Sequence, residues 1–172
     1  MPVTYTSGDQ IEVYRFSIPV AILVPLFAVF LQAFLPKQFP FLSIFDLPLL
    51  VTIFFAVARR SQVSGLITGA LIGLLQDSLS TQPIGLYGIS KTVVGYGASS
   101  LGVRLDVENA GTRLLVTFVF CVIHHFVYFV VARGLVGQAV ETNWLRALGS
   151  ASANAVLAVA LFAILDRFKQ RA

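Results

Sequence analysis

LLVTFVFCVIHHFVYFVVA, residues 114–132, contains no Lys, Arg, Asp or Glu and is long enough to cross a bilayer, which takes roughly 20 residues. Five other stretches of the chain have a similar apolar character. Hydrophobic residues make up 57% of the sequence and charged residues 12%, which is more apolar surface than one soluble core can bury. We therefore predict an all-α polytopic integral membrane protein, a six-helix transmembrane bundle that forms one domain over residues 1–172. The predicted spans cover residues 16–35, 41–58, 63–79, 84–103, 114–132 and 144–165.

The basic residues predict the orientation of this bundle. With the N-terminus inside, eight of them lie on the inner side and three on the outer side, and cytoplasmic loops carry the excess of Lys and Arg. Six spans then place both termini in the cytoplasm. Because the charges cluster beside helix ends, they indicate membrane topology and not nucleic-acid binding. The inner residues are Arg15, Arg59, Arg60, Arg104, Arg113, Arg167, Lys169 and Arg171, and the outer ones are Lys37, Arg133 and Arg146.

Four polar residues lie in the outer third of the predicted bilayer. Asp46 is near the outer end of the second span, Gln76 and Asp77 are near the outer end of the third, and Lys91 is about two turns into the fourth. Charged groups at that depth are costly unless they pair inside the bundle. We predict that Asp77 pairs with Lys91, because a short turn joins their helices. The pair has two readings: a structural ion pair, or part of a polar pocket for a ligand or a docking point for another helix.

Glycines recur along the third and fourth predicted spans. Gly65, Gly69 and Gly73 are four residues apart, which puts them on one helix face where another backbone can approach closely. We interpret this face as a contact within the bundle, and an intermolecular contact is the alternative. Small residues continue in the fourth and sixth spans, at Gly85, Gly88, Gly95, Gly97, Gly149, Ser150 and Ala153.

Residues that could carry chemistry are sparse. His124 and His125 are adjacent in the fifth span and point about 100° apart on a helix, so they do not form a metal site by themselves. We expect one histidine to be bonded to a partner helix, with a proton relay as the alternative. The sequence has one cysteine, Cys121, and no nucleophile elbow or phosphate-binding glycine loop. We therefore expect no enzymatic activity, no metal and no cofactor.

Three consecutive segments read FDLPLLVTIFFAVARR (residues 45–60), GLITGALIGLLQDSLS (residues 65–80) and PIGLYGISKTVVGY (residues 83–96). Together they resemble the MreD family, the small membrane subunit of the bacterial rod-shape (elongation) system. In this chain Pro48 follows the aspartate of the second span, whereas family members often have a proline before it. The positions that match the family pattern are Asp46, Gly73, Leu74, Asp77, Gly85, Lys91, Gly95 and Tyr96.

The resemblance implies a non-enzymatic scaffold in the bacterial inner membrane, surrounded by lipid. The implied partner is MreC, a single-span protein with a periplasmic domain. The assembly would couple MreB filaments indirectly to the peptidoglycan polymerase RodA and its class B penicillin-binding transpeptidase. The family is also similar in architecture to the S subunits of energy-coupling-factor transporters. That similarity gives an alternative function, a vitamin-type substrate-binding subunit with a pocket on the outer side.

Overall fold

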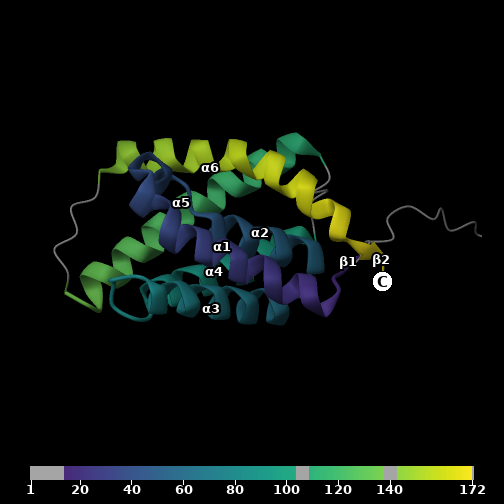
Figure 1. The fold of residues 1–172 in the computed structure, drawn as a ribbon, viewed down its shortest axis with the longest axis horizontal. Helices are drawn as coiled ribbons and strands as arrows, with labels where there is room; N and C mark the ends of the chain where they lie inside the picture. Colours follow the sequence, from purple (N-terminus) through teal and green to yellow (C-terminus); the bar gives the residue numbers. More distant parts are fainter. Residues whose placement is uncertain (1–13, 104–108, 138–142, 172) are drawn as a thin grey trace, which may run out of the picture.

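The computed structural model describes residues 14–103, 109–137 and 143–171, and these residues form a helical bundle with one pair of very short strands (Figure 1). The strands are β1 (Tyr14–Arg15) and β2 (Gln170–Arg171), and two 3-10 helices are η1 (Pro40–Ile44) and η2 (Asp166–Phe168). The α-helices are α1 (Ile18–Gln38), α2 (Leu47–Arg59), α3 (Gln62–Leu79), α4 (Leu86–Gly102), α5 (Ala110–Gly134) and α6 (Trp144–Leu165).

Six α-helices in the described residues follow the six predicted spans in order, which confirms the all-α prediction. Four segments are long and apolar enough to cross a membrane: Ile18–Gln38, Pro40–Arg59, Ala110–Gly134 and Trp144–Phe168. The helices α3 and α4 have 18 and 17 residues, close to the lower limit of a span. The crossing of the membrane by all six helices therefore stays a prediction.

The helix α2 is the centre of the bundle. Every residue from Pro48 to Ala58 is buried, because α2 is covered by α1, α3, α4, α5 and α6. A helix that is apolar all round is typical of a buried or membrane-embedded position. At one end of α2, Phe54 and Phe55 pack edge-on against Phe16, and Phe54 also contacts the ring of Phe162. Phe16 precedes α1 and Phe162 lies on α6, so this aromatic cluster joins the ends of the chain to the core.

The helices α3 and α4 form a hairpin in which the two backbones touch. A Cβ atom added to Gly65, Gly69 or Gly73 would overlap a backbone carbonyl oxygen of α4. The contact within the bundle that the glycine spacing predicts is therefore confirmed. The sixth helix differs from the prediction at Gly149, which has open space where a side chain would lie.

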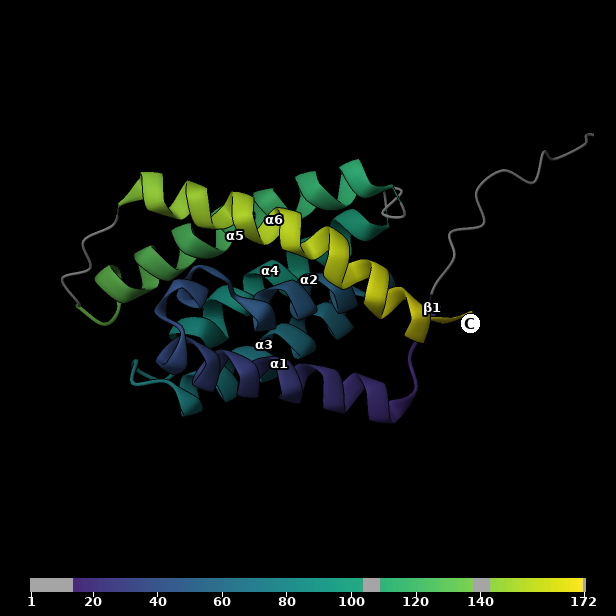
Figure 2. The ribbon, with the colours of Figure 1, turned by 45° about the horizontal axis from the view of Figure 1, so that its top comes forward.

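Both ends of the described chain lie at the same end of the bundle. Strand β1 pairs with β2 in antiparallel register, Tyr14 opposite Arg171 and Arg15 opposite Gln170 (Figure 2). If the helices cross a membrane, two chain ends on the same side require an even number of crossings. We call this end of the bundle, where α2, α4 and α6 finish, the Arg59 end. The opposite end, where these helices begin, is the Asp46 end.

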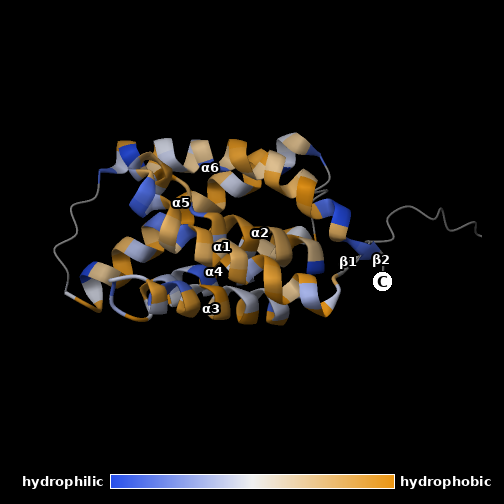
Figure 3. Cartoon of the chain, in the orientation of Figure 1, coloured by the Kyte–Doolittle hydropathy of each residue, from blue (hydrophilic) through white to orange (hydrophobic). Residues whose placement is uncertain are grey.

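Large apolar side chains cover much of the outer surface. Phe27 of α1, Leu115 of α5 and Val156 of α6 are each more than half exposed, and Figure 3 shows apolar residues along all the helices. An exposed apolar surface of this extent is stable in lipid and not in water.

Candidate functional site

Asp46 and Lys91 form the central ion pair of the Asp46 end. Asp46 is the N-cap of α2, and its Oδ1 accepts a hydrogen bond from the backbone N–H of Leu49 at 2.9 Å. The Nζ of Lys91, on α4, lies 2.9 Å from Oδ1 and 2.7 Å from Oδ2 of Asp46. The lysine side chain is fully buried, and a charge in that position requires a close counter-ion. The pair connects α4 to the first turn of α2.

The predicted Asp77–Lys91 pair is wrong, because Asp77 caps α4 instead. Its Oδ2 accepts hydrogen bonds from the backbone N–H groups of Gly85 at 2.8 Å and Gly88 at 2.9 Å, and its Oδ1 accepts one from Tyr87 at 3.0 Å. These amides belong to the start of α4, where N–H groups lack partners within the helix and a negative charge is favoured. Gly85 has a φ of 108°, a conformation that residues with a Cβ rarely adopt.

Asn154 of α6 holds the chain where η1 meets α2. Its Oδ1 accepts a hydrogen bond from the backbone N–H of Asp46 at 2.9 Å, and its Nδ2 donates to the carbonyl of Ile44 at 2.9 Å. The hydroxyl of Ser150 donates to the same carbonyl at 2.6 Å. A helix that is interrupted inside a bundle needs such substitutes for its missing backbone bonds.

Gln32 of α1 holds the same junction from the other side. Its Nε2 donates to the carbonyl of Phe45 at 2.9 Å, and its Oε1 accepts from the backbone N–H of Leu47 at 3.1 Å. The sequence interpretation missed both Gln32 and Asn154 as site residues. The available signal was a side-chain amide in the middle of an apolar helix, which is costly unless it bonds to another segment.

Two adjoining cavities open beside this cluster. The smaller has a volume of about 200 Å³ and the larger about 530 Å³, and Gln32, Ser43, Gln76 and Tyr87 line both. The smaller cavity contacts the ion pair and α5, through Asp46, His124, His125 and Tyr128 among others. The larger runs between α1 and the turn after α3, and its other lining residues are Val29, Ala33, Pro36, Lys37, Leu79, Ser80, Thr81 and Gln82.

His124 and Gln76 bring polar atoms without partners to these cavities. His124 is 4% exposed, its ring stacks parallel to that of Tyr87, and its Nε2 lies 4.0 Å from Oδ2 of Asp46. Within the described residues, neither ring nitrogen of His124 has a hydrogen-bond partner. The Oε1 of Gln76 has none either. Buried polar atoms of this kind normally have a hydrogen-bond partner, so these atoms can accept or donate a further hydrogen bond.

The second histidine is bonded within its own helix. The Nδ1 of His125 lies 2.7 Å from the carbonyl oxygen of Cys121, one turn earlier in α5. Among the described residues neither histidine has a hydrogen bond to another helix, and His124 contacts α4 by stacking on Tyr87. No group of three or more His, Cys, Asp or Glu residues in the described part of the chain could hold a metal ion.

The remaining predicted residues lie outside the cavities. Gly65, Gly69, Gly73 and Gly95 lie at the contact between α3 and α4. Tyr96 is about half exposed on α4, away from the ion pair. The structure therefore brings together Asp46, Lys91 and Gln76, places Asp77 and Gly85 at the start of α4, and gives the other glycines a packing role.

An apolar helical bundle with large apolar side chains on its outer surface and a buried ion pair is the architecture of a polytopic membrane protein. The comparison with protein families identifies it further. The family model described as rod shape-determining protein MreD matches residues 12–171, nearly the whole sequence, so the chain belongs to the MreD family. No curated protein and no solved structure matches it.

Proposed function

We propose that this rod shape-determining membrane protein is a non-enzymatic scaffold of the elongation complex in the bacterial inner membrane. In this role it binds an MreC-like single-span protein and helps couple MreB filaments to peptidoglycan synthesis by RodA and its class B transpeptidase. Membership of the MreD family supports the role in cell shape. The observation that supports partner binding is the pair of cavities at the Asp46 end, with polar atoms that have no partner in the described chain.

The cavities suit a peptide segment better than a lipid tail. Each buried polar atom without a hydrogen bond costs about 1–3 kcal/mol, so the backbone or polar side chains of a partner gain energy by bonding His124 and Gln76. The larger cavity is also lined by Ser43, Ser80 and Gln82, which offer further donors and acceptors. We propose that the Asp46 end faces outward, because most of the basic residues lie towards the Arg59 end. An outward cavity is accessible to the membrane-proximal part of an MreC-like partner.

Co-purification from native membranes tests this proposal. Ser43 is exposed and lines both cavities, so Ser43→Trp should fill the entrance and lower recovery of the MreC-like partner about tenfold, the effect of 1.4 kcal/mol. The matched control is Ser152→Trp, at an exposed serine of α6 outside both cavities, which should recover the partner as the unmodified chain does. Equal recovery with both variants would show that the cavities do not hold this partner.

A vitamin-type ligand is the second candidate, as for the S subunit of a transporter. The stacking of His124 on Tyr87 gives the smaller cavity an aromatic wall, and the larger cavity has the size of ligand sites, roughly 300–1,000 Å³. Native mass spectrometry of the purified protein distinguishes the two. A bound small molecule that Ser43→Trp removes would support the transporter role over the scaffold role.

A further inference from the structure

A groove separate from the Asp46-end cavities lies between α1 and α3. These two helices (Figure 2) contact each other over part of their length. The groove between them has a volume of about 550 Å³. Three of its polar lining residues, Arg59, Ser61 and Ser64, lie at the Arg59 end, and the fourth, Thr68, lies one turn further along α3. The rest of the lining is apolar. The lining residues are Ala21, Ile22, Pro25, Leu26, Arg59, Ser61, Val63, Ser64, Ile67, Thr68, Leu71, Ile72 and Leu75.

The apolar part of the groove is open to the outside of the bundle. Ile22 and Leu26 of α1 and Ile67 and Leu71 of α3 are each at least half exposed. From Ser61 to Leu75 the groove follows α3 for about 20 Å, at 1.5 Å per residue. One leaflet of hydrocarbon is about 15 Å thick, so the groove is long enough for an acyl chain.

The polar end of the groove contains a guanidinium group held in place. The Nη1 of Arg59 donates a hydrogen bond to Oγ of Ser64 at 3.1 Å. The guanidinium also lies over the rings of Phe55, at 5.6 Å, and Phe16, at 6.0 Å. Beside it, Ser61 caps α3, so this helix begins at the polar end of the groove. A helix N-terminus and a fixed arginine together favour a phosphate.

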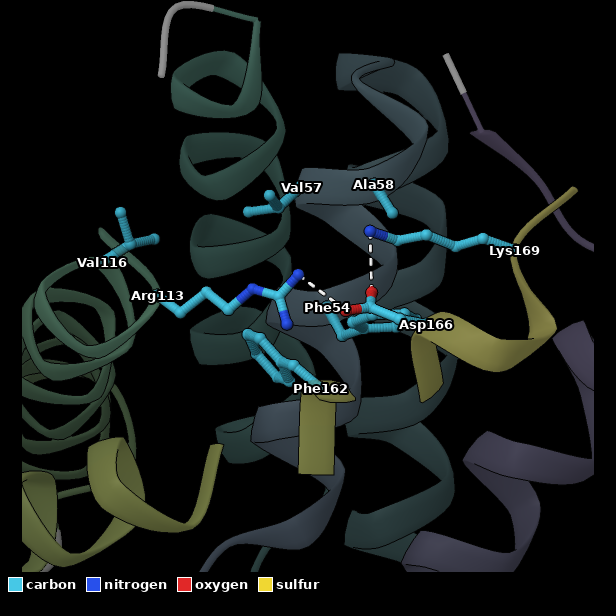
Figure 4. Close-up of a pocket in the computed structure, with 8 residues that line it drawn as sticks. All are labelled: Phe54, Val57, Ala58, Arg113, Val116, Phe162, Asp166 and Lys169. Atoms are coloured by element: carbon cyan, nitrogen blue, oxygen red, sulfur yellow. Dashed lines mark ion pairs between the residues drawn. The ribbon is translucent and has the colours of Figure 1, made fainter. Parts of the chain in front are cut away.

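The charge of Arg59 is not neutralised within the described chain. No carboxylate of the described residues lies within ion-pair distance of it, and none of the groove's lining residues is acidic. On the other side of α2 the basic side chains have a carboxylate partner. Arg113 and Lys169 both point toward Asp166 and pair with it at 2.6 and 2.7 Å (Figure 4). The groove therefore presents a positive charge at one end of an apolar channel that faces lipid.

We propose that this groove binds one anionic phospholipid from the leaflet at the Arg59 end. Its phosphate bonds to Arg59, Ser61 and the start of α3, and one acyl chain lies between α1 and α3. An anionic phospholipid has a negative headgroup that matches the Arg59 end of the groove and an apolar tail that matches the rest. The membrane also supplies it at high concentration. Bound in this way, the lipid would neutralise Arg59 and fill the space between α1 and the rest of the bundle.

Native mass spectrometry of the full-length protein tests the headgroup contact, with phosphatidylglycerol as the anionic probe and phosphatidylcholine as the zwitterionic one. We expect phosphatidylglycerol to be retained preferentially. Arg59→Gln should lower its retention about fivefold, the effect of one basic residue near an anionic lipid. The matched control is Arg167→Gln, at an exposed arginine of the same end outside the groove, which should leave retention unchanged. An equal loss from both variants would overturn the proposal, because general surface charge would then explain the binding.

A second pair of variants tests the acyl-chain contact without changing the charge. Ile67→Trp should fill the groove and lower phosphatidylglycerol retention, whereas Leu115→Trp, at an exposed position of α5, should not. Unchanged retention with Ile67→Trp would overturn the proposal. Crosslinking of a Leu71→Cys variant to a partner protein in native membranes, together with no retained lipid, would assign the groove to a partner's helix. That result would also overturn the lipid proposal.

Discussion

Lys91→Met is expected to destabilise the protein severely, and the added change Asp46→Asn is expected to restore much of the loss. Breaking a buried ion pair by removing one partner leaves an uncompensated charge and costs about 3–5 kcal/mol. The Nζ of Lys91 has both carboxylate oxygens of Asp46 within 2.9 Å, so the two side chains depend on each other. Asn at position 46 can still cap α2, because its side-chain oxygen can accept the Leu49 N–H. Thermal denaturation of the purified variants in detergent measures the coupling as a double-mutant cycle.

The control for this cycle is Lys37→Met, at an exposed lysine of the same end. Lys37 lies over the ring of Phe34 at 5.4 Å, and we expect its loss to change the denaturation temperature little. If the double variant is as unstable as the sum of the single variants, Asp46 and Lys91 do not depend on each other. If the double variant recovers stability but not cell shape, the pair also serves the docking of a partner.

Gly69→Leu is expected to prevent the bundle from assembling. A Cβ atom at this position would overlap the carbonyl oxygen of Lys91, so the backbones of α3 and α4 would have to separate. The cost should exceed the roughly 1–3 kcal/mol of an overpacked core, because a backbone cannot rotate away as a side chain can. The measurement is the amount of folded protein that accumulates in the membrane.

Gly149→Leu is the matched control for this change, because a side chain at position 149 would meet no atom within 4 Å. It should accumulate at the level of the unmodified chain. Similar accumulation of the Gly69→Leu and Gly149→Leu variants would contradict the close packing of α3 on α4.

The order and approximate position of the helices could be predicted from the sequence because apolar length is a strong signal. The start of the second helix could not be predicted so well. The predicted span begins at residue 41, but residues Pro40–Ile44 form η1 and α2 begins at Leu47. Both segments are apolar, and the break between them depends on bonds from Gln32 and Asn154, which lie far away in the sequence.

The sequence predicted which charged residues belong to the candidate site but not which of them pair with each other. Asp46, Asp77 and Lys91 were identified because charges are rare in apolar helices. The wrong pairing of Asp77 with Lys91 came from counting opposite charges on adjacent helices. That count leaves out the backbone N–H groups at the start of α4, three of which occupy the Asp77 carboxylate. Lys91 therefore pairs with Asp46, which is far away in the sequence and close in the fold.

We propose that the cavities at the Asp46 end face outward and are covered by an MreC-like partner. Accessibility of Ser43→Cys to a membrane-impermeant thiol reagent tests it most directly, in a chain whose one cysteine, the buried Cys121, is replaced by alanine. In spheroplasts we predict reaction at Ser43→Cys when the partner is depleted and protection when it is present, with no reaction at Ser61→Cys of the opposite end. Equal labelling of Ser43→Cys with and without the partner would show that the partner does not cover the cavities. Labelling at Ser61→Cys alone would show that the Asp46 end faces the cytoplasm.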